Sequence, residues 1–278
     1  MPSPEEAGKK GSKGQGAKAG AEFLGSAKAF AGAQNRVRNL KNRAALQLLL
    51  DLLERDAAPG LPSYVQVGAN DGKMGDPFYP RTSIGRWRAL LLEPSPQFFG
   101  QLCETHPDNP NVTALNLGVA AQKGQLDLYQ LNPEYDHLYP EEVKGVASMV
   151  EGQFEAVLRR RYDDVRPEHI QRVAVELDRL DRIIADNDMQ DADALIVDVE
   201  GFEMQVFDSF SLDSFRPKLS IYERTHLDGK TRKLLNQRHA DAGYAVYEVI
   251  ADNLAIRLDW LTETVDLVLA MLDARRLH

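Results

Sequence analysis

The stretch YVQVGANDGKMGDPFYPRTSIGRWRALLLE, residues Tyr64 to Glu93, decides the fold. It opens with the strand-like run YVQV, passes through a loop rich in Gly, Asn and Asp, and ends with a second apolar run before Glu93. Apolar runs that alternate with glycine turns and helical segments are typical of βαβ units. Glycine at the turn, here Gly68, allows a positive φ and lets a ligand come close to the backbone. The stretch therefore predicts the first half of a nucleoside-binding α/β fold.

Glu93 follows Gly68 by 25 residues and ends the second predicted strand. An acidic residue there accepts hydrogen bonds from ribose hydroxyls in dinucleotide-binding folds. The sequence of the loop indicates which class of cofactor binds, a nicotinamide dinucleotide or another nucleoside-containing cofactor. The second glycine of the GxGxxG pattern lets pyrophosphate approach, and Asn70 stands in its place. S-adenosylmethionine has no phosphate and tolerates a side chain there, so it is the expected cofactor.

A third cofactor contact is expected where the third strand ends. Asn116, Leu117, Gly118 and Val119 form a natural loop for the adenine, although a simple turn explains them nearly as well. The expected cofactor-binding residues are Gly68, Asn70, Asp71, Gly72, Glu93, Pro94, Asn116, Gly118, Val119 and Asp198.

Three regions are expected along the chain. Residues 1–35 are rich in Gly, Ala, Lys and Ser and are expected to form a disordered basic tail. Residues 36–60 are expected to be helical because leucines gather on one face from Asn39 to about Asp56. Residues 61–278 form the catalytic domain, with a substrate-side insertion at about 132–170, where the pattern is polar and irregular.

Composition excludes several classes of protein. The net charge of -9 argues against a general nucleic-acid binder, which needs a basic surface. The single cysteine, Cys103, rules out an intrachain disulfide and a cysteine zinc site, so we expect a reducing, cytoplasmic setting. No apolar run approaches the roughly 18 residues that a membrane span requires.

Four blocks in this order resemble the FkbM-type methyltransferase family: VQVGANDG, LLLEPSP, VELDRLDRII and ALIVDVEGFEMQVF. The resemblance implies a class I methyltransferase fold, which is a Rossmann-like α/β fold. Its seven-stranded sheet is mostly parallel with an antiparallel edge strand, and helices cover both faces. The resemblance also implies S-adenosylmethionine as methyl donor, a hydroxyl-bearing acceptor, and Ser148 and Met149 on the acceptor side. Family members often have Lys where this chain has Ile196, so any role of that lysine does not transfer.

Candidate catalytic residues follow the later strands. Asp198, Glu200, Glu223 and His226 come directly after the apolar runs ALIV and PKLSIY. In an open α/β sheet, ligands bind beyond the carboxyl ends of the strands, so these four side chains are expected to meet. Asp198 is expected to face the methionine ammonium or the acceptor, or instead to cap the following helix. Glu200 is expected to hold the acceptor hydroxyl.

His226 is the expected general base, because its ordinary pKa is near 6.5 and Glu223, three residues earlier, can orient the ring. Glu203, one turn beyond Glu200, is expected to face solvent or a basic partner. The same side chains suit Mg²⁺ or Mn²⁺, but a metal is not the favoured interpretation.

The sequence thus predicts an S-adenosylmethionine-dependent O-methyltransferase acting on a small molecule or glycan, with no nucleic-acid partner and no membrane span. Two alternative functions are also compatible with the sequence. One is a non-catalytic, methyltransferase-like binding module. The other is a nicotinamide-dependent oxidoreductase.

Overall fold

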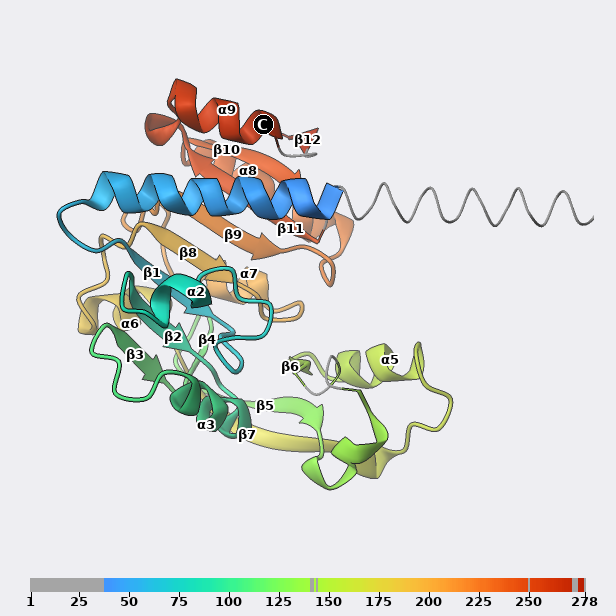
Figure 1. Ribbon diagram of the computed structural model, residues 1–278. Helices are drawn as coiled ribbons and strands as arrows, with labels where there is room; N and C mark the ends of the chain where they lie inside the picture. Colours follow the sequence, from blue (N-terminus) through green and yellow to red (C-terminus); the bar gives the residue numbers. More distant parts are fainter. Residues whose placement is uncertain (1–37, 141–142, 144, 250, 272–274, 278) are drawn as a thin grey trace, which may run out of the picture.

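The computed structural model describes residues 38–140, 143, 145–249, 251–271 and 275–277. The segment 1–35, predicted to be a disordered tail, lies outside the described residues. Figure 1 shows an α/β body and, beside it, a smaller lobe formed by the middle of the chain.

The body is built on an eight-stranded sheet with the order β12-β10-β11-β9-β8-β1-β2-β3. Strands β3, β2, β1, β8 and β9 all run parallel to one another. Strand β11 is antiparallel to both of its neighbours, β9 and β10. The two-residue β12 forms an antiparallel edge beside β10. The predicted fold, a mostly parallel seven-stranded sheet with an antiparallel edge, is confirmed, and β12 is an additional short strand. The sheet strands are β1 (Ser63–Val67), β2 (Arg88–Leu92), β3 (Val112–Leu115), β8 (Ala194–Val197), β9 (Leu219–Glu223), β10 (Tyr244–Val249), β11 (Asp252–Arg257) and β12 (Arg275–Arg276).

Helices cover both faces of this sheet and create two apolar cores. Strands buried on both faces read as almost continuous apolar runs, as in ALIV of β8, where all four residues are buried. Successive side chains of β1 point to opposite faces, so Tyr64 belongs to one core and Val65 to the other. The helices of the body are α2 (Tyr79–Thr82), α3 (Pro96–Thr105), α6 (Leu180–Asp186), α7 (Glu203–Phe207), α8 (Gly229–Asp241) and α9 (Glu263–Met271), with the 3₁₀ turn η3 (Leu258–Trp260).

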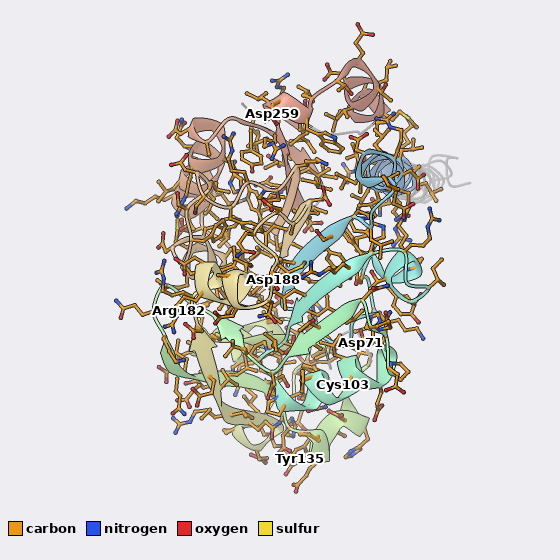
Figure 2. The ribbon with its side chains drawn as sticks, turned by 90° about the vertical axis from the view of Figure 1, so that its left-hand side faces the viewer. Asp71, Cys103, Tyr135, Arg182, Asp188 and Asp259 are labelled. Carbon is orange, nitrogen blue, oxygen red and sulfur yellow. The ribbon has the colours of Figure 1, made fainter. Side chains whose placement is uncertain are left out.

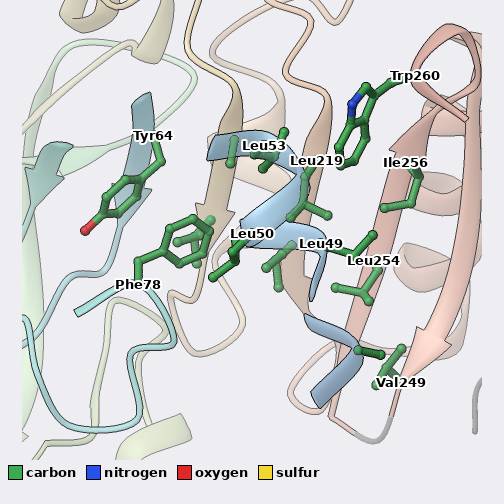
Figure 3. Packing of buried hydrophobic residues seen from close by; sticks show 14 of the residues in the cluster. Leu49, Leu50, Leu53, Tyr64, Phe78, Leu219, Val249, Leu254, Ile256 and Trp260 are labelled. Carbon is green, nitrogen blue, oxygen red and sulfur yellow. The ribbon is translucent and has the colours of Figure 1, made fainter. Parts of the chain in front are cut away.

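A helix formed by residues 38–57 lies across one face of the sheet. Its leucines Leu49, Leu50 and Leu53 are fully buried, and Figure 3 shows them packed towards the sheet residues Leu219 and Ile256. Polar contacts hold the end of the helix as well, since Trp87 Nε1 donates to Glu54 at 2.7 Å and Trp260 Nε1 donates to Asp56 at 2.7 Å. This helix is therefore part of the core of the body.

The middle of the chain forms a second, four-stranded sheet with the order β4-β7-β5-β6. Strands β5 and β7 pair along their full antiparallel length and extend away from the body, and the lobe at their tip has an apolar cluster of its own around Phe154 and Leu158. In Figure 2, Tyr135 of this lobe and Asp259 of the body mark opposite ends of the molecule. The elements are β4 (Gly118–Val119), β5 (Gly124–Leu131), η1 (Pro133–Leu138), β6 (Ala147–Ser148), α5 (Gln153–Arg159), η2 (Pro167–His169) and β7 (Ile170–Asp178).

The proposed insertion at about 132–170 corresponds to the tip of this structure. We call the whole segment from β5 to β7, residues 124–178, the arm; its two long strands, β5 and β7, lie almost entirely outside those limits. Within the described part of the chain, the helices are too short or too polar to cross a lipid bilayer.

Candidate active site

A cavity of about 740 Å³ opens at the carboxyl ends of β1, β2, β8 and β9. Its size falls within the range of small-molecule sites, which is roughly 300–1,000 Å³. The body supplies most of its wall, the arm supplies Leu128, Gly145, Ala147 and Met149, and the helix 38–57 supplies Arg43, Leu46 and Gln47. The cavity therefore lies between all three parts of the molecule.

Gly68 forms the turn at the end of β1 and lies in the cavity wall. Its φ is +83°, and a Cβ atom there would lie 1.8 Å from the carbonyl oxygen of Asp198. The backbones after β1 and β8 approach too closely for any side chain. Glycine is thus required at this position, as the sequence predicted, and its absent side chain leaves the backbone open to the cavity.

Glu93 lies at the end of β2 and is only 5% exposed. Its two carboxylate oxygens accept hydrogen bonds from the backbone N–H groups of Asn70 and Ser95, each at 2.8 Å. Burial raises the pKa of Glu93 to about 7, although these two hydrogen bonds oppose the rise. Each oxygen keeps a further lone pair, so the carboxylate is fixed in place and can still accept from a ligand.

The predicted cofactor loop divides into residues that line the cavity and residues that shape the loop. Asn70 lines the cavity, and its Nδ2 donates to the carbonyl of Gly145 in the arm at 2.6 Å. Asp71 accepts from the N–H groups of Lys73 and Met74, which makes it a turn residue; Figure 2 labels it beside α3. A side chain on Gly72 would meet Leu102 of α3 at 2.4 Å.

Pro94 lines the cavity next to Glu93, whereas the predicted adenine loop does not. Asn116 donates through Nδ2 to the carbonyls of Glu93 and Pro94, both at 2.9 Å. Gly118 and Val119 form β4 and are buried, and a Cβ on Gly118 would meet Leu177 at 2.5 Å. The structure thus places these three residues behind the Glu93–Pro94 segment, and their direct contact with adenine stays a prediction.

The arm is tied to the loop that follows β8. Gln153 Nε2 donates to the carbonyl of Glu200 at 2.6 Å, and Ser148 Oγ donates to the same carbonyl at 3.3 Å. Of the two residues expected on the acceptor side, Met149 lines the cavity, while Ser148 holds this contact behind it. Because the arm also contacts Asn70, it bridges the two ends of the cavity.

Carboxylates gather at the end of the cavity formed by β8, β9 and β11. Asp198, Glu200, Glu223 and Asp252 all line it. Burial is the main cause that raises the pKa of each; for the last three the values are about 7, 9 and 6, and repulsion from Asp198 adds to the rise. The Asp198 side chain is exposed within the cavity even though protein surrounds it closely. This end therefore suits a positively charged or proton-donating ligand.

His226 lies directly behind this carboxylate end. Its Nε2 is 3.0 Å from Glu200 Oε2 and 3.7 Å from Glu223 Oε1. Burial, together with the positive charges of Arg160 and Arg161, lowers the pKa of His226. The structure thus brings together all four predicted catalytic residues, and Glu200, not Glu223, makes the shorter contact with the ring.

Glu200, Glu223 and His226 also form the arrangement expected of a cation site. Each offers a ligand atom, and the three atoms lie within 4.8 Å of one another. Their chemistry suits Mg²⁺ or Mn²⁺. The same three groups can also exchange protons: burial raises the pKa of both carboxyls and lowers that of the imidazole, which brings their proton affinities closer together.

The prediction that Glu203 faces solvent is wrong. Glu203 is fully buried, and its Oε1 accepts from the N–H groups of Val199 at 3.2 Å and Gly201 at 3.3 Å. It therefore satisfies the turn after β8. Asp198 does not cap the following helix, because the N-cap of α7 is Phe202. The prediction assumed that Glu200 and Glu203 lie one helical turn apart. The helix α7 begins only at Glu203, so Glu200 belongs to a turn and the helical spacing does not apply.

Sequence reasoning missed five polar residues of the cavity. They are Arg43, Gln47, Gln66, Asp76 and Asp252. Only Asp252, at the start of β11, gave a recognisable signal, because β11 is antiparallel and its first residue lies beside the carboxyl end of β9. The helix residues gave none, since their position depends on how the helix packs.

A comparison with protein-family models identifies a family. The model of the methyltransferase FkbM domain matches residues 66–249. No curated protein matches the chain. Among solved structures, a methyltransferase FkbM from Methylobacillus flagellatus KT is similar with 13% identity and a TM-score of 0.45, over 70% of this chain and 43% of that one. The present chain therefore spans less than half the length of that protein.

Two further structures show weaker similarity. A fibrillarin pre-rRNA processing protein from Methanococcus jannaschii has 9% identity and a TM-score of 0.37, over 71% of this chain and 66% of that one. A precorrin-6y C5,15-methyltransferase from Geobacter metallireducens GS-15 has 12% identity and a TM-score of 0.33, over 74% of this chain and 84% of that one. Since the family model covers most of the chain, the chain belongs to the FkbM methyltransferase family.

Proposed function

We propose that this protein transfers a methyl group from S-adenosylmethionine to a hydroxyl oxygen of a small molecule or glycan. The observation that supports this most directly is the composition of the single cavity described above. One end holds the fixed carboxylate of Glu93, and the other holds Glu200 and Glu223 with His226 in contact. A donor site and a proton-accepting site thus share one space.

The residues fit the cofactor. Gly68 opens the backbone at the end of β1, and Glu93 presents lone pairs that ribose hydroxyls can use. Hydrogen bonds from a ligand to a buried carboxylate favour its ionised form, so ribose binding would lower the raised pKa of Glu93. Asp198 at the end of β8 faces the same cavity and suits the positive charge of the methionine ammonium.

S-adenosylmethionine supplies an electrophilic methyl group that an oxygen attacks in line with the departing sulfur. The protein's contribution is to align the two reactants and to accept the hydroxyl proton. Glu200 in the cavity wall accepts the hydrogen bond of the acceptor hydroxyl. As the new C–O bond forms, Glu200 takes the hydroxyl proton and passes it to His226, whose Nε2 lies 3.0 Å from Glu200 Oε2. The ionised Glu200 then stabilises the imidazolium, and Glu223 Oε1, 3.7 Å from the same nitrogen, helps to orient the ring.

Family membership favours methyl transfer over hydride transfer. The loop agrees with this choice, because the Asn70 side chain binds the arm at the position where a pyrophosphate would need glycine.

The proposal is tested by incubating the protein with S-adenosylmethionine and a panel of hydroxyl-bearing small molecules and glycans. We expect one acceptor to gain the mass of one methyl group. His226→Ala should lower turnover on that acceptor by about 100-fold or more while cofactor affinity changes little. His137→Ala, which removes an exposed histidine outside the cavity, is the matched control. Wild-type turnover in His226→Ala would end the role of His226 as base.

A further inference from the structure

The helix 38–57 forms one wall of the cavity through Arg43, Leu46 and Gln47. Figure 1 shows this helix antiparallel to β9, so its first turns reach the carboxyl ends of the strands. Gln47 Nε2 donates to the carbonyl of Pro77 at 3.3 Å, at the end of the loop that begins at Gly68. Because Arg43 lies one turn before Gln47, it shares that face of the helix and stands above the same loop.

Arg43 differs in charge from the other charged residues that line the cavity, which are carboxylates. Among the described residues that line it, six carry carboxylates, and Arg43 alone carries a permanent positive charge. Arg43 also makes no hydrogen bond or ion pair with any residue in the part of the chain that the structure describes, whereas Arg55 on the same helix pairs with Asp56 at 2.9 Å. Its guanidinium is thus available to an anionic group of a ligand.

Gln66 provides an independent polar group on the same side. It projects from β1 into the cavity wall, is 7% exposed, and its Oε1 has no hydrogen-bond partner among the described residues. An unsatisfied buried carbonyl is unfavourable unless a ligand or water donates to it. The cavity therefore offers, near one end, a free cation and a free acceptor, which match the carboxylate and the ammonium of an α-amino acid.

We propose that Arg43 binds the α-carboxylate of the methionyl group of S-adenosylmethionine, while Gln66 Oε1 accepts one of the three ammonium N–H groups alongside Asp198 of the neighbouring strand end. This inference rests on the proposed function. With its ribose held by Glu93, the cofactor would extend its amino-acid end along the 68–77 loop towards the helix 38–57, where Gln47 contacts Pro77. The helix is then a specificity element of the cofactor site, because it selects ligands that retain the carboxylate.

The test is calorimetric titration of the full chain with two ligands, S-adenosylmethionine and its decarboxylated form, which differ only in this carboxylate. Arg43→Ala should weaken binding of S-adenosylmethionine on the order of 10-fold, as expected for a charge-assisted hydrogen bond, and leave the decarboxylated ligand unaffected. Lys41→Ala removes an exposed charge from the same helix outside the cavity and should change neither affinity. Arg43→Lys should recover part of the loss.

Two results would overturn the inference while leaving the proposed function intact: unchanged affinity of Arg43→Ala for S-adenosylmethionine, or equal weakening for both ligands. If wild-type protein binds neither ligand, the proposed function fails, and the inference fails with it. Thermal melting of each variant, together with Arg43→Gln as a second neutral variant, separates a lost contact from lost folding.

Discussion

Glu203 is a fully buried carboxylate next to the cavity, and burial raises its pKa to about 7 from an ordinary value of 4.5. A carboxyl group whose pKa is higher in the folded than in the unfolded protein binds its proton more tightly when folded. Its contribution to stability is present in full below pH 4.5 and is lost as the pH rises through 7. Ionised Glu203 is thus a source of instability in alkaline solution.

Glu203→Gln should remove part of this pH dependence. We expect the variant and the wild type to have similar free energies of unfolding at pH 5, and the variant to be more stable at pH 9 by on the order of 1–2 kcal/mol. Urea unfolding across this range measures the difference. If the free energies of unfolding of the two proteins change with pH in the same way, Glu203 does not titrate as its burial implies.

Methyl transfer should not depend on a divalent cation. In the proposed reaction the Glu200–His226 pair, whose atoms lie 3.0 Å apart, accepts the hydroxyl proton itself, so no metal-activated oxygen is needed. We expect turnover to survive exhaustive chelation. Loss of activity that Mg²⁺ or Mn²⁺ restores would instead make Glu200, Glu223 and His226 a metal site.

At this scale the sequence predicted residues whose position follows from topology alone. Glu93, Asp198, Glu200 and Glu223 follow strands, and the carboxyl ends of parallel strands meet in one place. The burial of Glu203 and the place of Arg43 in the cavity depend on a turn conformation and on helix packing. Neither leaves a pattern in a single sequence.

At the scale of elements, the helix 38–57 is attached to the sheet chiefly by its leucines. Leu50 is fully buried, whereas Leu48 on the same helix is 38% exposed. Leu50→Ala should reduce the free energy of unfolding by about 3 kcal/mol, through lost burial and the remaining cavity, and Leu48→Ala by less than about 1 kcal/mol. Chemical denaturation of both variants measures this contrast. Equal, small losses would indicate that the helix is only loosely attached.

The leucine pattern was sufficient to predict this helix, because apolar residues at helical spacing mark a buried face. The arm was harder. The polar, irregular sequence indicates the tip, but it does not indicate the long antiparallel pair of β5 and β7, since the paired residues are 39 to 53 positions apart in the chain. Its contacts with Asn70 and with the Glu200 carbonyl depend on the folded arrangement.

At the scale of the whole molecule, the body, the arm and the helix 38–57 enclose a cavity with Glu93 at one end and the carboxylates Glu200 and Glu223 at the other. The central claim is that the cofactor end binds S-adenosylmethionine through Glu93. Each carboxylate oxygen of Glu93 is oriented by a backbone N–H group, so its loss should remove hydrogen bonds to ribose without moving the strands.

The most direct test is calorimetric titration of S-adenosylmethionine into the wild type, Glu93→Ala and Glu104→Ala, the last being an exposed carboxylate on α3 outside the cavity. We predict binding by the wild type, unchanged affinity in Glu104→Ala, and affinity at least about 10-fold weaker in Glu93→Ala, as expected when hydrogen bonds to a charged group are lost. Absence of binding by the folded wild-type protein, or equal affinity in Glu93→Ala, would contradict the account.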